Sequence, residues 1–177
     1  LKDGENKLAA QVFKWTSSSW CEDQDFYRFS GIYRDVYLYA IPQVHVSDVK
    51  IQTLLDDTYT HADLTVDVKA TAAGKLRMTL AKDGEVLQTK EEALTETASY
   101  VMKVENPELW SAETPVLYDL LLEVMDENGV VTEVIPQRVG FRRFEMKGNI
   151  MTLNGKRIVF KGVNRHEFSS VTGRNVS

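Results

Sequence analysis

The chain has 177 residues, of which 43% are hydrophobic and 27% are charged, with a formal net charge of -5 at pH 7. This composition is typical of a globular protein and excludes a disordered chain. The acidic balance argues against nucleic acid as a partner. A single cysteine, Cys21, excludes a disulfide scaffold. No apolar run reaches the roughly 18 residues of a membrane span, so we expect no membrane partner.

The first 42 residues contain two alternating stretches, 6–13 and 36–40, which predict strands. Between them Glu22, Asp23 and Asp25 place three carboxylates within four positions. Asp23 and Asp25 would project to one side of an extended segment. Carboxylate oxygens suit a hard cation or sugar hydroxyls. A solvated acidic loop is the simpler interpretation when these residues are considered alone.

Residues 43–144 predict a series of short antiparallel strands. Apolar and polar residues alternate in several segments, and 118–125 is almost continuously apolar, as in a central strand. The alternating segments are 44–53 with a slip at Ser47–Asp48 typical of a bulge, 62–68, 76–80 and 100–104. Hairpin turns are predicted at 82–85 and 126–129, with return strands from Val86 and over 130–135. Only 91–96 could form a helical turn. The expected fold class is an all-β, immunoglobulin-like antiparallel β-sandwich.

The last part of the chain predicts a hairpin over 145–160, built on Asn154–Gly155. The apolar run 158–160 then leads into the polar, Gly-led segment 162–167. A strand that ends in such a polar segment resembles the first strand of an α/β barrel, in which chemistry gathers at the carboxyl ends of strands. His166 could donate to a ligand hydroxyl or be a structural histidine. The segment 166–170 begins like a zinc protease motif, but Ser170 replaces the second histidine and excludes it.

Three stretches, taken together and in this order, resemble the large bacterial β-galactosidases of glycoside hydrolase family 2. They are Glu-Asp-Gln-Asp at 22–25 with Ser-Gly-Ile-Tyr-Arg-Asp-Val at 30–36, Asn-Pro-Glu-Leu-Trp-Ser-Ala-Glu at 106–113, and Val-Gly-Phe-Arg at 139–142 with Asn-Arg-His-Glu at 164–167. The resemblance implies the end of a sugar-binding jelly-roll domain over 1–42. It implies an immunoglobulin-like domain over 43–144 and the beginning of the catalytic TIM barrel over 145–177. We therefore expect this sequence to be part of a longer parent protein.

The resemblance also implies an activity and a set of site residues. The parent is expected to hydrolyse terminal β-D-galactosides of the lactose type with retention of configuration, and β-glucuronidase and β-mannosidase are the alternatives within the family. Asp25 is implied to hold the galactosyl hydroxymethyl group and a sodium ion. His166 is implied to contact a sugar hydroxyl, and Asn164 belongs to the same substrate-binding motif. The chain departs from familiar members at 168–170, which puts nearby contacts in doubt.

Retaining hydrolysis needs two carboxyl groups about 5 Å apart. The resemblance places both glutamates beyond Ser177, so we expect no catalytic residue here and an inactive interdomain module without a cofactor of its own. The parent is expected to use sodium and magnesium, to bind a galactoside, to form a homo-oligomer and to be cytoplasmic. The competing hypothesis is a free-standing sandwich that binds carbohydrate or protein, with Trp15, Trp20 and Trp110 stacking on the ligand.

Overall fold

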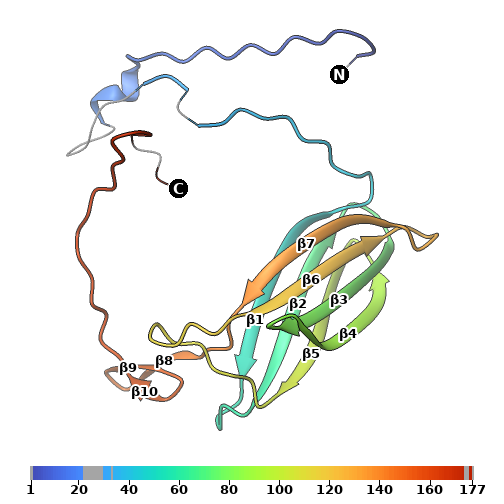
Figure 1. The fold of residues 1–177 in the computed structure, drawn as a ribbon, viewed down its shortest axis with the longest axis vertical. Coiled ribbons are helices and arrows are strands. Elements are labelled where there is room, and N and C mark those ends of the chain that lie inside the picture. The colour runs from blue at the N-terminus through green and yellow to red at the C-terminus, as the bar shows by residue number, and fades with distance from the viewer. Residues whose placement is uncertain (1, 22–29, 33, 174–175, 177) are drawn as a thin grey trace. The chain divides into compact units, whose positions relative to one another are not determined.

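The computed structural model describes residues 2–21, 30–32, 34–173 and 176. The chain divides into two units, one formed by 1–39 with 161–177 and the other by 40–160, and each is described by itself (Figure 1). In the part of the chain that the structure describes, no helix is long and apolar enough to cross a membrane.

The second unit is dominated by a sandwich of two antiparallel sheets (Figure 1). One sheet has the order β1-β2-β5 and the other the order β4-β3-β6-β7. The strands are β1 (Val46–Leu55), β2 (His61–Ala70), β3 (Gly74–Lys82), β4 (Glu85–Leu94), β5 (Thr97–Glu105), β6 (Tyr118–Met125) and β7 (Val131–Val139). Seven strands split between two facing sheets confirm the predicted immunoglobulin-like architecture.

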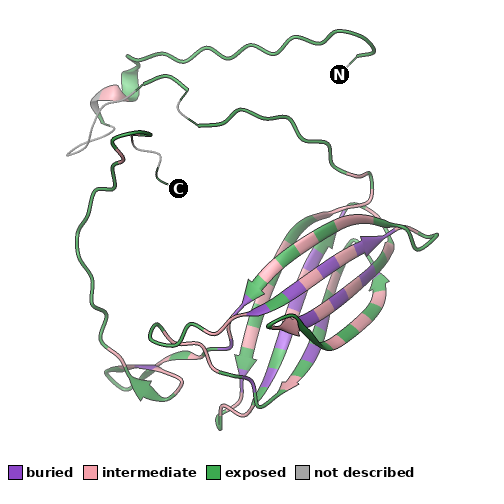
Figure 2. Ribbon diagram, viewed as in Figure 1, coloured by how far each residue is buried: buried purple, intermediate pink, exposed green. Residues whose placement is uncertain are grey.

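The apolar residues that alternate with polar ones in the sequence form the inner, buried face of each sheet. In β2 every second residue from Ala62 to Ala70 is buried (Figure 2). The opposite sheet contributes the fully buried alternating residues of its central strands β3 and β6. The fully buried residues of the two facing sheets are Leu64, Val66 and Val68 on β2, Leu76, Met78 and Leu80 on β3, and Leu120, Leu122 and Val124 on β6. Burying one such side chain contributes roughly 1.5–3 kcal/mol, so this shared face is the main source of the sandwich's stability.

The turns follow the predicted chemistry. Asp83 and Gly84 both have positive φ (51° and 85°), as a two-residue hairpin between β3 and β4 requires. The predicted bulge lies between Val46 and Asp48 of β1. Several strands are longer than expected, among them β4 and β7. The segment 91–96 forms no helical turn, because β4 continues to the buried Leu94. β7 passes through Pro136, which is tolerated because β7 is an edge strand.

A third, smaller sheet follows the sandwich. It has the order β10-β9-β8 and consists of β8 (Phe144–Lys147), β9 (Ile150–Leu153) and β10 (Lys156–Arg157). Asn154 and Gly155 form the predicted turn between β9 and β10, with φ of 50° and 76°. The predicted barrel strand at 158–160 is not formed. The Ile158 N–H donates to the Met151 carbonyl on β9 (3.0 Å), but the pairing stops there, and Val159 and Phe160 are each 68% exposed.

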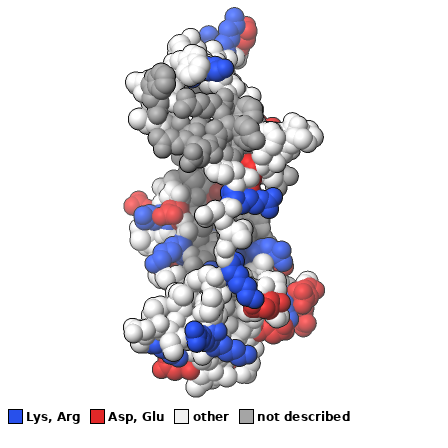
Figure 3. Space-filling view, turned by 90° about the vertical axis from the view of Figure 1, so that its left-hand side faces the viewer, with Lys and Arg blue, Asp and Glu red and all other residues white. Residues whose placement is uncertain are grey.

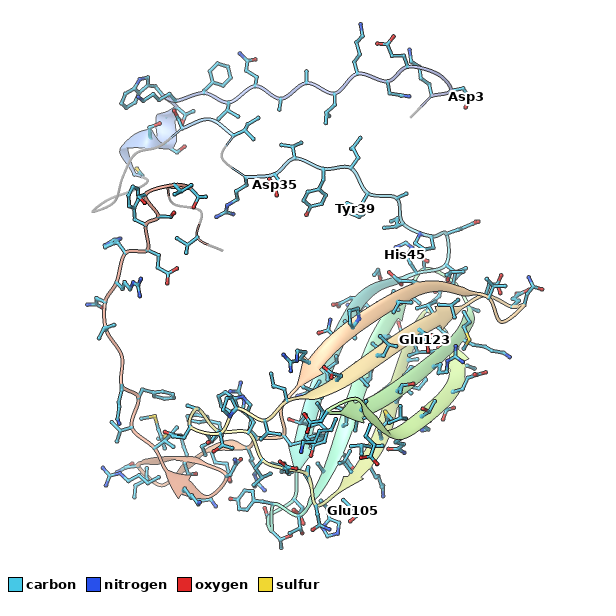
Figure 4. All side chains as sticks on the ribbon, in the orientation of Figure 1. Asp3, Asp35, Tyr39, His45, Glu105 and Glu123 are labelled. Atoms are coloured by element: carbon cyan, nitrogen blue, oxygen red, sulfur yellow. The ribbon has the colours of Figure 1, made fainter. Side chains whose placement is uncertain are left out.

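The first unit contains one short 3-10 helix, η1 (Ser17–Trp20), among its described residues. The segments 6–13 and 36–40, predicted as strands, are irregular and exposed. Tyr37 and Leu38 are 73% and 80% exposed, and Figure 4 shows Asp35 and Tyr39 on an extended single segment. Alternation alone does not make a strand, because a strand also needs a partner for its backbone groups and a cover for its apolar face.

Candidate functional site

The predicted substrate-binding residues are not assembled into a described site. Asp25 lies outside the described residues. Asn164 and His166 lie in the first unit, on exposed backbone without regular structure. Among the residues that the structure describes, no group of three or more His, Cys, Asp and Glu could hold a metal ion. The carboxylate of Asp25 is chemically suited to a hard cation such as sodium, and its assignment stays a prediction.

The structure instead brings together motifs that are far apart in the sequence, at one end of the sandwich. Leu109 forms a parallel bridge with Phe141. The backbone N–H of Trp110 donates to the Phe141 carbonyl (2.8 Å), and the Asn154 side-chain amide donates to the Trp110 carbonyl (3.1 Å). The stretch 106–113, the Val-Gly-Phe-Arg stretch and the Asn154–Gly155 turn therefore meet at one place, which we call the junction.

Trp110 is the anchor of the junction. A Cβ atom on Gly140 would lie 3.0 Å from three side-chain atoms of Trp110, closer than ordinary van der Waals contact, so the chain that follows β7 passes tightly against the indole side chain. The Arg142 guanidinium lies over the indole ring, 4.5 Å from its centroid. With Gly140 and Arg142 against it, Trp110 is half-buried, and part of its side chain lines the groove between β1 and β7. Trp15 is 65% exposed, and the side chain of Trp20 lies outside the description.

Phe141 fastens the junction to the sandwich core. Its side chain is fully buried and meets the Tyr118 ring edge to face, with centroids 4.9 Å apart. The Tyr118 hydroxyl accepts a hydrogen bond from the Glu108 backbone N–H (2.8 Å). One buried aromatic pair thus holds both the loop before β6 and the segment after β7.

Arg143 continues the contacts toward the turn between β1 and β2. Its guanidinium donates to Asp57 (2.7 Å) and to the carbonyl of Leu55 (3.4 Å), and it pairs with Glu145 (3.1 Å). The hydrogen bond to the Asp57 carboxylate, more than the nearby charge of Glu145, raises the pKa of Arg143. Its backbone N–H donates to Asn154 Oδ1 (2.9 Å). Arg143 therefore joins the sandwich to the small sheet from both its side chain and its backbone.

A groove of about 540 Å³ lies along the side of the sandwich between the edge strands β1 and β7. The two strands are joined at both ends of the groove. The Val46 N–H donates to Glu133 (2.8 Å), and the Thr53 hydroxyl donates to the Gly140 carbonyl (3.1 Å). The described residues that line the groove include no Asp, Glu, His or Cys. The groove therefore lacks the paired carboxyl groups that retaining hydrolysis requires.

Charged side chains elsewhere on the sandwich are paired across strands and do not form a site. Arg77 on β3 donates to Glu123 on β6 (2.8 Å), and Lys69 on β2 lies 3.4 Å from Asp48 on β1. Figure 3 shows Lys and Arg interspersed with Asp and Glu on the face in view. Such a mixed surface is typical of a solvated face.

The contacts that Arg143 makes beside the junction could not be predicted from the sequence. Asp57, Arg143 and Glu145 were not expected to act together, because they are up to 88 positions apart in the sequence. The sequence held one indication that the turn at 56–60 makes further contacts. This turn combines two aspartates, two threonines and an aromatic residue, which is more side-chain chemistry than a plain hairpin turn needs.

Comparison with family models matches the chain in three consecutive parts. Residues 44–142 match the model of glycosyl hydrolases family 2. Residues 1–42 match the sugar binding domain of that family, and residues 144–177 match its TIM barrel domain.

Curated relatives and solved structures agree with these matches. A beta-galactosidase of Halalkalibacterium halodurans is 50% identical over 99% of this chain, and one of Clostridium acetobutylicum is 46% identical over the whole chain. The chain spans 18% and 20% of their lengths. The structure of Bacteroides uniformis beta-glucuronidase 3 superimposes with a TM-score of 0.73 at 28% identity, covering 86% of this chain and 20% of that one. Since the family model over 44–142 alone takes in more than half of the residues, this chain belongs to glycosyl hydrolase family 2.

Proposed function

We propose that this chain is part of a β-galactosidase that hydrolyses terminal β-D-galactosides with retention of configuration. The support is the identity of 46–50% to two proteins named beta-galactosidase, over essentially all of the chain. The glucuronidase of Bacteroides uniformis is 28% identical, which makes glucuronide hydrolysis the weaker alternative. In this proposal residues 1–42 end the sugar-binding domain, 43–144 form the immunoglobulin-like domain and 145–177 begin the barrel.

Within that enzyme, the sandwich and the small sheet act together as a rigid connector. One observation carries this role: Trp110 is hydrogen-bonded both to Phe141, which follows the sandwich, and to Asn154, in the turn of the small sheet. These bonds, together with the buried Phe141 ring, fix the small sheet on the end of the sandwich. The connector would set where the chain leaves toward the barrel.

The predicted site residues would contribute to substrate binding in the complete enzyme. We assign Asp25 to the galactosyl hydroxymethyl group and a sodium ion, and His166 and Asn164 to sugar hydroxyls. A carboxylate accepts hydrogen bonds from hydroxyls, and imidazole and amide N–H groups donate to them. The pair of catalytic carboxyl groups, and a magnesium ion, would be held by other parts of the enzyme. The chain by itself would be inactive.

We also propose a compartment and an assembly state for the parent. The exposed free thiol of Cys21 suits a reducing compartment such as the cytoplasm. The net charge of -5 gives no surface for nucleic acid. A homo-oligomeric parent is the family expectation.

The test is an assay of the full-length parent with an aryl β-galactoside and the matching aryl β-glucuronide. We expect a higher kcat/KM for the galactoside and no turnover by the 177-residue chain. His166→Asn should raise KM for the galactoside, whereas His61→Asn, which alters an exposed histidine on the sandwich, should leave KM unchanged. A parent that prefers the glucuronide, or a KM insensitive to His166, would contradict the assignment.

A further inference from the structure

Tyr59, in the turn between β1 and β2, has a backbone conformation that is unfavourable for its residue type. Its φ is 61°. The other described non-glycine residues with positive φ are Asp83, Asn106 and Asn154, and Asp and Asn tolerate this region well. A bulky aromatic residue persists there only when its surroundings hold it, and such strain concentrates at functional positions.

Tyr59 packs against the sandwich core on one side and contacts the small sheet on the other. The phenol hydroxyl donates to Glu145 Oε1 on β8 (3.1 Å) and accepts from Lys147 Nζ on the same strand (3.2 Å). The ring lies against the turn between β9 and β10, where a Cβ atom on Gly155 would be 3.0 Å from the ring carbon Cε2 and from the hydroxyl oxygen. One side chain of the sandwich thus touches both β8 and the β9–β10 turn.

Glu145 is the centre of these contacts. Its side chain is only 18% exposed, and its carboxylate lies 3.1 Å from Arg143 and 3.7 Å from Lys147 in addition to the phenol. The Tyr59 hydroxyl, and after it the Glu145 charge, raises the pKa of Lys147. With Asp57 paired to Arg143, the cluster holds two cations and two anions. We call Tyr59, Arg143, Glu145, Lys147 and Asp57 the lock.

We propose that Tyr59 is a positioning residue, whose ring and hydroxyl hold the small sheet β8–β10 on the sandwich and so set the direction of the chain that leads to Asn164 and His166. The effect on substrate binding rests on the proposed function, whereas the lock itself is a property of this chain. The Asn154–Trp110 hydrogen bond is a separate attachment. Loss of the lock should therefore loosen the small sheet without detaching it.

Hydrogen exchange measured by mass spectrometry on the 177-residue chain tests the lock directly. Tyr59→Phe keeps the ring and removes both hydrogen bonds of the hydroxyl. We expect exchange in 144–157 to become about 2–10 times faster, as expected for a lost hydrogen bond, with β2, β3 and β6 unchanged. Tyr100→Phe is the matched control, because that hydroxyl also makes a hydrogen bond within the sandwich, to the Ala93 carbonyl (2.7 Å).

Tyr59→Gly tests the contacts of the ring. Glycine adopts positive φ freely, so this variant relieves the backbone strain, and it also removes the ring, which packs against the sandwich core and against Gly155. Exchange in 144–157 should increase more than in Tyr59→Phe, because the ring contact with Gly155 is lost as well. Unchanged exchange in 144–157 for both Tyr59 variants would overturn the lock. Equal loosening of this segment by Tyr100→Phe would overturn it too.

Kinetics of the full-length parent then test the consequence for substrate binding. Tyr59→Phe should raise KM for the galactoside while kcat stays within about twofold, since the reacting groups are untouched. Faster exchange in 144–157 with an unchanged KM would reject the positioning role. A wild-type parent without galactosidase activity would reject the proposed function, and the exchange result would still decide the lock.

Discussion

Replacing Phe141 with alanine is the sharpest test of how the junction is attached to the sandwich. The Phe141 side chain is fully buried in the main core and packs edge to face on Tyr118. Truncating a buried phenylalanine costs about 3–5 kcal/mol, from lost burial and the cavity that remains. A small domain is stable by only about 5–15 kcal/mol, so a large part of its stability should disappear.

The assay is urea unfolding followed by far-UV circular dichroism, which reports on the strands. We expect a lower midpoint at an unchanged m-value, and a melting temperature lower by about 12 °C or more. Phe144→Ala is the matched control, because the same side chain three positions later is 52% exposed. It should cost less than about 1 kcal/mol. Equal losses in the two variants would refute the packing of the junction on the core.

Two further predictions concern the sandwich. Gly74→Ala should destabilise it by about 1–3 kcal/mol, because the new Cβ would lie 2.6 Å from the Met125 carbonyl oxygen. Gly162→Ala, where a Cβ meets nothing within 4 Å, should be neutral in the same urea titration, and a neutral Gly74→Ala would contradict the close approach. Hydrogen bonds from the backbone N–H groups of Val130 and of residue 128 lower the pKa of Asp126. The Asp126 carboxylate therefore stabilises the folded state above about pH 4, and this stabilisation is lost as the pH falls through the lowered pKa. Asp126→Ala should therefore lower the urea midpoint at pH 7, and the difference from wild type should shrink toward pH 3; a difference independent of pH would show that the carboxylate charge is irrelevant.

The local pattern of apolar and polar residues was sufficient to predict most strands of the sandwich. Alternation in 62–68 and 76–80 predicted which residues of β2 and β3 face the core, and the continuous apolar run predicted β6 at its observed bounds, Tyr118–Met125. The turn at Asp83–Gly84 follows from the conformations these residue types tolerate. Each of these features depends only on residues within a few positions of one another, so it can be predicted from a single sequence.

The same alternating pattern did not predict the structure of the segments on either side of the sandwich. Residues 36–40 and 158–160 have strand-like patterns, yet neither is a strand in the structure. Whether an alternating segment pairs depends on a partner strand, and the segment's own sequence does not specify one. The substrate-binding set of Asp25, Asn164 and His166 rests on the resemblance alone, because it requires side chains from distant parts of the chain to meet.

The sequence by itself determined the family and the sandwich, because motifs and periodicity are local properties of the chain. Only the tertiary structure decided that Trp110, Phe141 and Asn154 meet, and that Tyr59 reaches Glu145 from 86 positions away. No pattern in one sequence encodes such a pairing, since it depends on how the β1–β2 turn and the small sheet are placed after the core has folded. The residues proposed to position the chain were therefore visible only in three dimensions.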